Sequence, residues 1–448
     1  MDKDQFENNM RVTAILGAGV NLEYFDWSDK TPSTANITKC IVSTKYFKHS
    51  DGSQSPIPSL IRKIYQRLCR KYPFGALNPK DNKSYGIMHF EKIFHALEEL
   101  DSYDKIWTRH AKDPSYAQLF AHFTKPAFKY NPDEIHSALF WMASLIMDFV
   151  NYYNDYFITH KEGTCKWYTD FWRKASFKWD VFNFNYDTTI ENSIDNFNDG
   201  YVDVEDHANI QRFDPNRLMQ SKTNTINHIH GCILYGYGDF SIEEENRDLI
   251  FKYGFHDWFK WDNYELNKKH WIGRSSSSEV SQSGGTLFPS PIITGLNKTD
   301  KLLTLPFSTH RLNLSQRLFQ SHALLIAGYS FGDYYVNYEL ERMRLYHGDK
   351  LRVVLIDYWD LQNYRDMSDQ DKIHAYLEFG EIDGISHQKA CFIEKVIHSS
   401  QLDYYKNGFK KLTHKNYMIS DNKQLMLFVG GWKNALQYRD KIYEFLCS

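Results

Sequence analysis

Residues 12–20 read VTAILGAGV, and this stretch decides the fold class because an apolar, β-branched run leads directly into a Gly-Ala-Gly turn. An apolar run without polar alternation is typical of a parallel strand that is buried on both faces. Glycines at such a strand end allow a sharp turn and bring main-chain N–H groups close to a pyrophosphate, although Leu22 replaces the third glycine of the usual GxGxxG fingerprint. The stretch therefore predicts a dinucleotide site in which Gly17, Ala18 and Gly19 contact the ligand.

Four further apolar runs predict the other buried strands: residues 179–183, 291–294, 323–327 and 352–356. Helical stretches separate them, and this alternation is typical of an α/β fold with a doubly wound, mainly parallel, Rossmann-like sheet. Ligands of such sheets bind at the carboxyl ends of the strands. The motifs FNYDTT and GYSFGD directly follow two of the runs, so their polar side chains are expected at one edge of the sheet.

Residues from about 55 to 178 predict a large helical insertion. In HFEKIFHALEEL (89–100) the apolar positions recur at helical spacing, which is typical of a helix that packs against a core. The opposite side of that helix carries charged residues: Glu91, Lys92, Glu98 and Glu99. The segment 133–153 is apolar around most of its circumference and is expected to be buried or to form an oligomer contact. We expect the insertion to cover the nucleotide cleft.

The predicted organisation is one nucleotide-binding domain over residues 1–365, followed by a helical C-terminal region over residues 366–448 that is a candidate assembly surface. A polar loop at 274–285 is either a lid over the cleft or an ordinary surface loop. The net charge of −3 gives no electrostatic reason to expect direct nucleic-acid binding. The apolar stretch 138–147 is too short to span a bilayer and the N-terminus lacks a signal-peptide pattern, so we expect a cytoplasmic protein without membrane contact.

Four motifs follow one another along the chain: GAG at 17–19, FNYDTT at 184–189, HIHG at 228–231 and GYSFGD at 328–333. Their order and spacing resemble the sirtuin-like (Sir2-type) NAD-hydrolase domain of bacterial antiphage defence systems, over residues of about 10 to 360. The resemblance implies that NAD+ is the substrate and that the bond between nicotinamide and ribose is cleaved. The chain departs from the sirtuin pattern after Gly19, where the Gly-Ile-Pro-x-Phe-Arg continuation is missing. Its six cysteines form no CxxC pair, so the small zinc module of protein-deacylating sirtuins is absent and no metal site is predicted.

The resemblance implies two catalytic residues, Asn185 and His230. The neutral amide of Asn185 can accept a hydrogen bond from water and donate one to the ribose, while the alternative is an asparagine that caps its own backbone. His230 matches the family's general base or ribose-hydroxyl partner, and an imidazole with a pKa near about 6.5 can transfer protons at neutral pH. The alternatives are a structural histidine, or a zinc ligand together with His228, although no third ligand stands at metal-site spacing.

Four further residues are expected to bind the ligand. Asp187 matches the acidic residue that contacts the nicotinamide carboxamide, and the alternative is a cap for the turn that follows it. Gly328 and Ser330 are expected to donate to phosphate or ribose, and Asp357 is placed to hold the adenosine ribose hydroxyls. Asp333 and Asn337 are expected to cap the next helix.

The leading hypothesis is an NAD+ hydrolase that releases nicotinamide and ADP-ribose and acts in antiphage defence by depleting NAD+. Such an enzyme must be gated, so we expect a homo-oligomer or an activating partner: a HerA-type ring ATPase, a short prokaryotic Argonaute or a phage protein. One alternative is an NAD-dependent protein deacylase or ADP-ribosyltransferase, against which the missing zinc cysteines argue. Another is a non-catalytic module that senses NAD or ADP-ribose. An ordinary Rossmann oxidoreductase ranks below these, because hydride transfer has no need of the FNYD and HIHG pair.

Overall fold

The computed structural model describes residues 10–24, 33–43, 57–71, 89–110, 132–205, 207–236, 259–270, 279–280, 286–287, 290–295, 298–303, 305–358, 387–397 and 417–448. A central sheet of eight strands runs in the order β13-β14-β12-β11-β1-β2-β6-β3. Its central strands are β1 (Arg11–Leu16), β2 (Lys178–Asn183), β11 (Ala323–Ala327) and β12 (Arg352–Ile356). These strands pair in parallel and are almost entirely buried, as their apolar sequences predict. The α/β, doubly wound, mainly parallel fold is therefore confirmed.

One predicted strand, residues 291–294, is wrong. Within the described part of the chain this segment forms a single bridge, between Ile292 and Gly231, and the main-chain N–H of Ile293 donates to the carbonyl oxygen of His230. Both isoleucines are buried. The apolar run therefore reflects burial of an irregular segment against the turn that follows β6 (Asn224–His228), not membership of the sheet.

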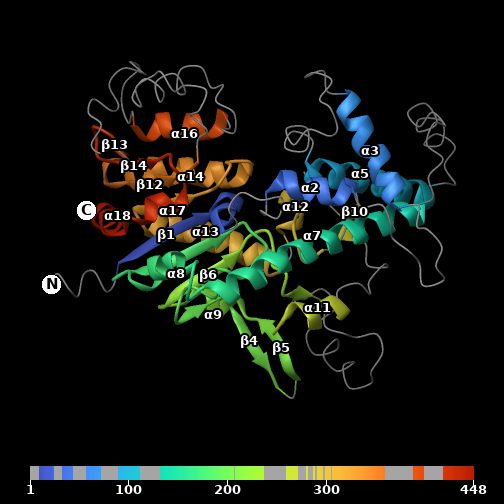
Figure 1. The fold of residues 1–448 in the computed structure, drawn as a ribbon, viewed down its shortest axis with the longest axis horizontal. Helices are drawn as coiled ribbons and strands as arrows, with labels where there is room; N and C mark the ends of the chain where they lie inside the picture. The colour runs from blue at the N-terminus through green and yellow to red at the C-terminus, as the bar shows by residue number, and fades with distance from the viewer. Residues whose placement is uncertain are drawn as a thin grey trace.

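The insertion is helical, as predicted, wherever it is described. Its helices are α3 (Ile57–Lys71), α5 (Phe90–His110), α7 (Pro132–His160) and α8 (Lys166–Arg173), and the helix α2 (Thr34–Ser43) precedes the predicted bounds. Figure 1 shows α2, α3, α5 and α7 grouped beside the sheet, with the long α7 running back toward it. Most of the predicted loop 274–285 lies outside the described residues; only the two-residue strand β9 (Glu279–Val280) is described, and it pairs with β10 (Thr286–Leu287).

A second, antiparallel sheet follows β2 along the chain and was not predicted. It consists of β4 (Tyr201–Val204), β5 (His207–Phe213), β7 (Tyr235–Gly236) and β8 (Phe259–Trp261). The short strand β3 (Phe197–Asn198) instead joins the edge of the central sheet. The short helices α9 (Pro215–Met219), α11 (Tyr264–His270) and α12 (Lys298–Lys301) accompany these segments, before the longer α13 (Phe307–Gln320) and α14 (Tyr334–His347).

The C-terminal region contains strands as well as the predicted helices. Its helices are α16 (His387–Ile397), α17 (Trp432–Leu436) and α18 (Arg439–Leu446), but β13 (Met418–Ile419) and β14 (Leu425–Phe428) extend the central sheet. β14 pairs in parallel with β12 and is buried along its whole length. The expectation of a purely helical extension is therefore wrong, because a run of four apolar residues is too short to be separated from a helix by its periodicity.

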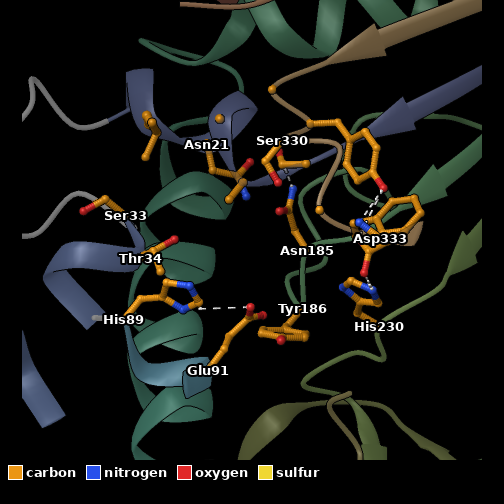
Figure 2. Close-up of a pocket in the computed structure, with 18 of the residues that line it drawn as sticks. Asn21, Ser33, Thr34, His89, Glu91, Asn185, Tyr186, His230, Ser330 and Asp333 are labelled. Carbon is orange, nitrogen blue, oxygen red and sulfur yellow. Dashed lines mark hydrogen bonds and ion pairs between the residues drawn. The ribbon is translucent and has the colours of Figure 1, made fainter. Parts of the chain in front are cut away.

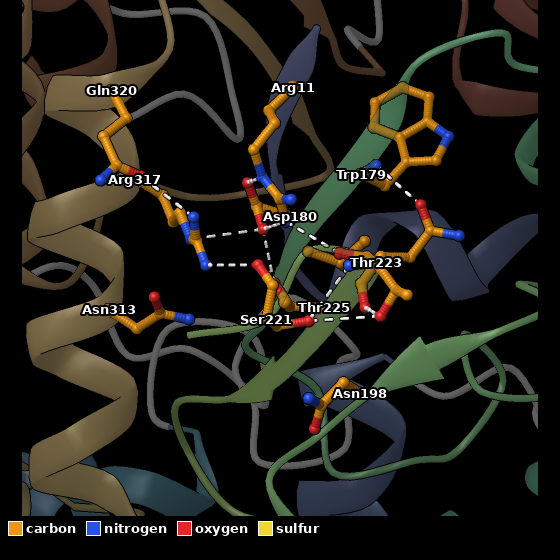
Figure 3. Close-up of polar contacts among 12 residues, drawn as sticks. Arg11, Trp179, Asp180, Asn198, Ser221, Thr223, Thr225, Asn313, Arg317 and Gln320 are labelled. Atoms are coloured by element: carbon orange, nitrogen blue, oxygen red, sulfur yellow. Dashed lines mark hydrogen bonds and ion pairs between the residues drawn. The ribbon is translucent and has the colours of Figure 1, made fainter. Parts of the chain in front are cut away.

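A buried polar cluster connects the amino ends of three central strands. It lies at the edge of the sheet opposite the one where the four motifs lie. Figure 3 shows Arg11, Thr225 and Arg317 converging on Asp180, which is fully buried. Arg11 Nε donates to Asp180 Oδ2 at 2.7 Å, and Thr225 Oγ1 donates to Oδ1 at 2.7 Å. The Nε atom of Arg317, on α13, lies 3.5 Å from the same carboxylate. The cluster thus joins three strands and a helix, and a buried carboxylate is tolerated there because two guanidinium groups face it.

Among the described residues, no helix combines the length and the apolar character that a membrane crossing requires.

Candidate active site

A cavity of about 810 Å³ opens at the carboxyl edge of the central sheet. Eight of the nine residues predicted to form the site line it: Gly17, Ala18, Gly19, Asn185, His230, Gly328, Ser330 and Asp357. Figure 2 shows part of the wall, with Ser33, Thr34, His89 and Glu91 on one side and His230 and Asp333 on the other. The fold thus gathers residues from five strand ends in one place, and their contact with a ligand remains a prediction.

The glycines at the first strand end pack directly against the turn that follows β11. A Cβ on Gly17 would lie 2.5 Å from the carbonyl oxygen of Gly328, and a Cβ on Gly19 would lie 2.7 Å from the Cα of Gly328. Their N–H groups donate to the carbonyl oxygens of Ala327 and Gly328, and the N–H of Gly328 donates to that of Ile356. These three glycines therefore serve close backbone approach, and their N–H groups donate to main-chain carbonyl oxygens of the protein instead of pointing toward a phosphate as predicted.

Asn185 lies two residues after the end of β2 and is anchored by its amide nitrogen. Nδ2 donates to the carbonyl oxygen of Gly17 at 3.1 Å, and the main-chain N–H donates to Oδ1 of Asn183 at 3.1 Å. The side chain is 7% exposed and lines the cavity. Since its nitrogen is engaged with the β1 turn, Oδ1 is the atom that can accept a hydrogen bond from a water or a ligand hydroxyl.

Asp187, the ninth predicted residue, does not line the cavity. It is fully buried and its Oδ1 accepts from the main-chain N–H of Thr189 at 3.0 Å, which is the turn-capping alternative. Its Oδ2 accepts from Nδ2 of Asn21 at 2.7 Å and from the hydroxyl of Tyr153 at 3.3 Å. Burial, opposed by the hydrogen bonds from Thr189, raises the pKa of the Asp187 carboxyl. Asp187 is therefore placed to act on the cavity through Asn21.

Asn21 was missed by sequence reasoning and is the residue that Asp187 orients. Its Nδ2 faces the carboxylate, so Oδ1 is the acceptor on the other side of the amide. Asn21 lines the cavity, is 1% exposed, and its Oδ1 has no hydrogen-bond partner among the described residues. A buried acceptor without a partner is costly, so this atom is suited to a ligand that brings an N–H or O–H donor.

His230 faces Asp333 across the cavity wall. β6 ends at His228, and the turn that follows separates the two histidines, so that His230 Nε2 lies 3.1 Å from Asp333 Oδ1. The expected capping role of Asp333 is wrong: the residue stands at the N-cap position of α14, but its side chain makes no capping hydrogen bond. Asn337 also does not cap α14, since its Nδ2 donates to the carbonyl oxygen of Phe331. Burial would raise the pKa of Asp333, but His230 and Lys298 outweigh it and hold that pKa well below its usual range.

Two charged residues outside the predicted set complete this wall. Lys298 Nζ lies 3.0 Å from Glu91 Oε1 and 3.6 Å from Asp333 Oδ1, and all three residues line the cavity. The sequence places Glu91 and Glu98 opposite the apolar stripe of α5. This charged side also contacts the rest of the protein, because Glu91 pairs with Lys298 of α12 and Glu98 pairs with Lys301 in the interior. Helical periodicity identifies two opposite faces, but it does not show what packs on the charged one.

His228, the other histidine of HIHG, is buried beneath the site. Its Nε2 lies 2.5 Å from Glu191 Oε1, and its Nδ1 lies 3.4 Å from the carbonyl oxygen of Asn185. Burial favours the neutral ring, but Glu191 outweighs it and raises the pKa of His228. Cys232 lies close by, with all three potential ligand atoms within 4.8 Å of one another. Two tetrahedral zinc ligands are about 3.3 Å apart, so the 2.5 Å contact fits a shared proton better than a metal ion.

The far end of the cavity is built by β12 and the C-terminal region. Asp357, one residue past β12, accepts a hydrogen bond from Lys389 Nζ at 2.5 Å, and the Lys389 side chain is 3% exposed. Lys389, Gly431 and Trp432 all line the cavity. The part of the chain predicted as an assembly surface therefore also contributes to the wall of the site.

Comparison with known protein families identifies one matching domain in this chain. The family model described as the SIR2-like domain matches residues 180–378, which begin in β2 and extend beyond β12. β1 precedes the matched region but lies between β11 and β2 in the same sheet, with its glycine turn in the cavity wall. No curated protein matches the chain.

Proposed function

We propose that this chain is an NAD+ hydrolase that releases nicotinamide and ADP-ribose, because the SIR2-like domain model matches residues 180–378 and Sir2-type domains use NAD+. The observation that carries the proposal is the meeting, in one cavity, of the Asn185 amide with the His230–Asp333 pair. The motifs that supply these residues lie far apart in the sequence. Their convergence at the carboxyl edge of the sheet is the arrangement that a nucleotide-cleaving site of this fold requires.

The cavity fits a dinucleotide in size and in the placement of polar groups. Its volume of about 810 Å³ lies within the range of small-molecule and cofactor sites. Asp357 stands at one end, where it can accept hydrogen bonds from ribose hydroxyls. The Oδ1 atom of Asn21, which has no partner among the residues that the structure describes, offers an acceptor that suits the amide N–H of the nicotinamide carboxamide. Asp187 fixes that acceptor by holding the amide nitrogen of Asn21.

The chemistry needs little assistance at the leaving group, because nicotinamide departs neutral once positive charge has moved to the ribose. The bond between the ribose carbon and the pyridinium nitrogen breaks with its electron pair on nitrogen, and a water oxygen forms the new bond to that carbon. Asn185 Oδ1 accepts a hydrogen bond from this water and orients it. His230 takes the proton that the water loses, and Asp333 stabilises the resulting imidazolium.

The proposal extends to biological context and regulation. An unregulated NAD+ hydrolase would deplete its own cell, so we propose an antiphage effector that is gated by self-assembly or by a partner. The alternative acceptors of the same cleavage are an acylated lysine, as in deacylases, and a protein side chain, as in ADP-ribosyltransferases. The absence of CxxC pairs from the sequence makes both less favoured.

The test is incubation of the purified full chain with NAD+, alone and together with the protein encoded beside it, followed by chromatography of the products. Free nicotinamide and ADP-ribose, lost in Asn185→Ala and in His230→Ala, would support the hydrolase and its site. NAD+ consumption that continues unchanged in either variant would refute the site assignment. Bound but uncleaved NAD+ under both conditions would favour the sensing module, and transfer of ADP-ribose to protein would favour a transferase.

A further inference from the structure

Two lysine–glutamate pairs join the insertion helix α5 to the short helix α12. Lys298 Nζ lies 3.0 Å from Glu91 Oε1, and Lys301 Nζ lies 2.5 Å from Glu98 Oε1. The two glutamates are seven residues apart and therefore share one face of α5. The charged side of α5 therefore forms a contact with α12, which we call the α5–α12 contact.

The two pairs differ in their relation to the candidate active site. Glu91 and Lys298 line the cavity and are 24% and 18% exposed, whereas Glu98 and Lys301 do not line it and are 6% and 7% exposed. The first pair also contacts the partner of His230, because Lys298 Nζ lies 3.6 Å from Asp333 Oδ1. The second pair ends in the interior, where Lys301 Nζ donates to the carbonyl oxygen of Thr294.

Glu91 and Asp333 compete for one ammonium group. Burial would raise the pKa of both carboxyls, but Lys298 contributes to lowering the pKa of each. Burial would lower the pKa of Lys298, but Glu91 and Asp333 outweigh it and raise that pKa. All three groups are therefore charged at neutral pH. The ammonium lies closer to Glu91 than to Asp333, by 3.0 Å against 3.6 Å, while Asp333 lies 3.1 Å from His230. His89, whose Nδ1 is 4.0 Å from Glu91 Oε2, also faces this group.

We propose that Glu91 is a positioning residue of the active site: it holds Lys298 away from Asp333, and so keeps the Asp333 carboxylate available to His230. This inference rests on the proposed NAD+ hydrolase function. It gives the helical insertion a role in positioning the His230–Asp333 pair, because Glu91 stands in the first turn of α5.

A double-mutant cycle tests this role. Glu91→Gln removes the charge that holds Lys298, so the ammonium moves to Asp333, and kcat for NAD+ cleavage should fall about tenfold with KM changed less than about twofold. Lys298→Met removes the competing ammonium. The double variant Glu91→Gln/Lys298→Met should therefore be several-fold more active than Glu91→Gln alone. If Glu91 had a purely structural role, the double variant would be no more active than Glu91→Gln, because a second substitution in the α5–α12 contact would destabilise the protein further.

Glu98→Gln is the matched control, since it breaks the other lysine–glutamate pair of the α5–α12 contact, which lies outside the cavity. It should lower the unfolding temperature at least as much as Glu91→Gln and leave kcat of the folded protein unchanged. The inference is overturned if Glu91→Gln retains wild-type kcat, if the double variant is no more active than Glu91→Gln, or if Glu98→Gln loses kcat equally. In those cases wild-type cleavage of NAD+ still stands, whereas a wild-type protein that cleaves no NAD+ overturns the proposed function and this inference together.

Discussion

Replacement of Asp333 by Asn tests the catalytic pair most directly, because it removes one charge and keeps the size of the side chain. At the observed 3.1 Å, a protonated His230 and the carboxylate attract each other by about 5 kcal/mol for an effective dielectric constant of about 20. Desolvation reduces the net contribution of a charge-assisted contact to about 1.5–3 kcal/mol. Since about 1.4 kcal/mol corresponds to tenfold in rate, kcat should fall about 10- to 150-fold.

The assay is the initial rate of nicotinamide release at saturating NAD+, measured under the conditions in which the wild-type chain turns over. Asp170→Asn is the control, because that carboxylate also pairs with two cations, Lys166 and Lys174, but does not line the cavity. The control should retain wild-type kcat. A kcat for Asp333→Asn within twofold of wild type, with an unchanged melting temperature, would refute the assignment of Asp333 as the partner of His230.

Three further predictions concern stability. Gly328→Ala should destabilise by about 1–3 kcal/mol, since the new Cβ would lie 2.5 Å from a main-chain nitrogen and φ is +58°; an unchanged urea midpoint would contradict this. Glu191→Gln should cost about 3–5 kcal/mol at pH 6 by leaving the buried His228 imidazolium unpaired. Because Glu191 raises the pKa of His228, its contribution is complete below about pH 6.5 and is lost as the pH rises through the raised value. The difference from wild type in urea unfolding should therefore shrink toward pH 9, and a constant difference would count against the pair. Lys389→Met should cost about 3 kcal/mol by leaving Asp357 without its ammonium, and an unfolding curve that matches wild type would exclude that pairing.

The main strands of the sheet could be predicted because their apolar composition indicates that they are buried. β1, β2, β11 and β12 are mainly apolar and buried on both faces, which is the property of strands covered by helices on both sides, and Asp180 of β2 is the buried charged exception. The same signal misled at residues 291–294, where an irregular segment is buried just as deeply. It was too short to identify β14, whose pairing with β12 depends on residues that are far away in the sequence.

The site residues fall into two groups: those that could be located from the sequence and those whose role depends on tertiary packing. Asn185 and His230 follow strand ends, so formation of the parallel sheet is enough to bring both of them to the cavity. Glu91 and Asp333 have ordinary local explanations in the sequence, as a charged helix face and as a helix cap. Only the packing of α5 against α12, and of the turn before α14 against the turn after β6, gives them partners.

The α/β class and the edge of the sheet at which the motifs meet could be predicted from the sequence alone, because apolar runs and strand-end turns are local patterns. The order and spacing of the four motifs carried the resemblance to NAD-cleaving domains. Tertiary structure alone decided which charges face one another: Glu91 with Lys298, Asp333 with His230, and Lys389 with Asp357. Electrostatic partners are set by distances of about 3 Å between side chains that are tens to hundreds of residues apart, and no local pattern encodes such distances.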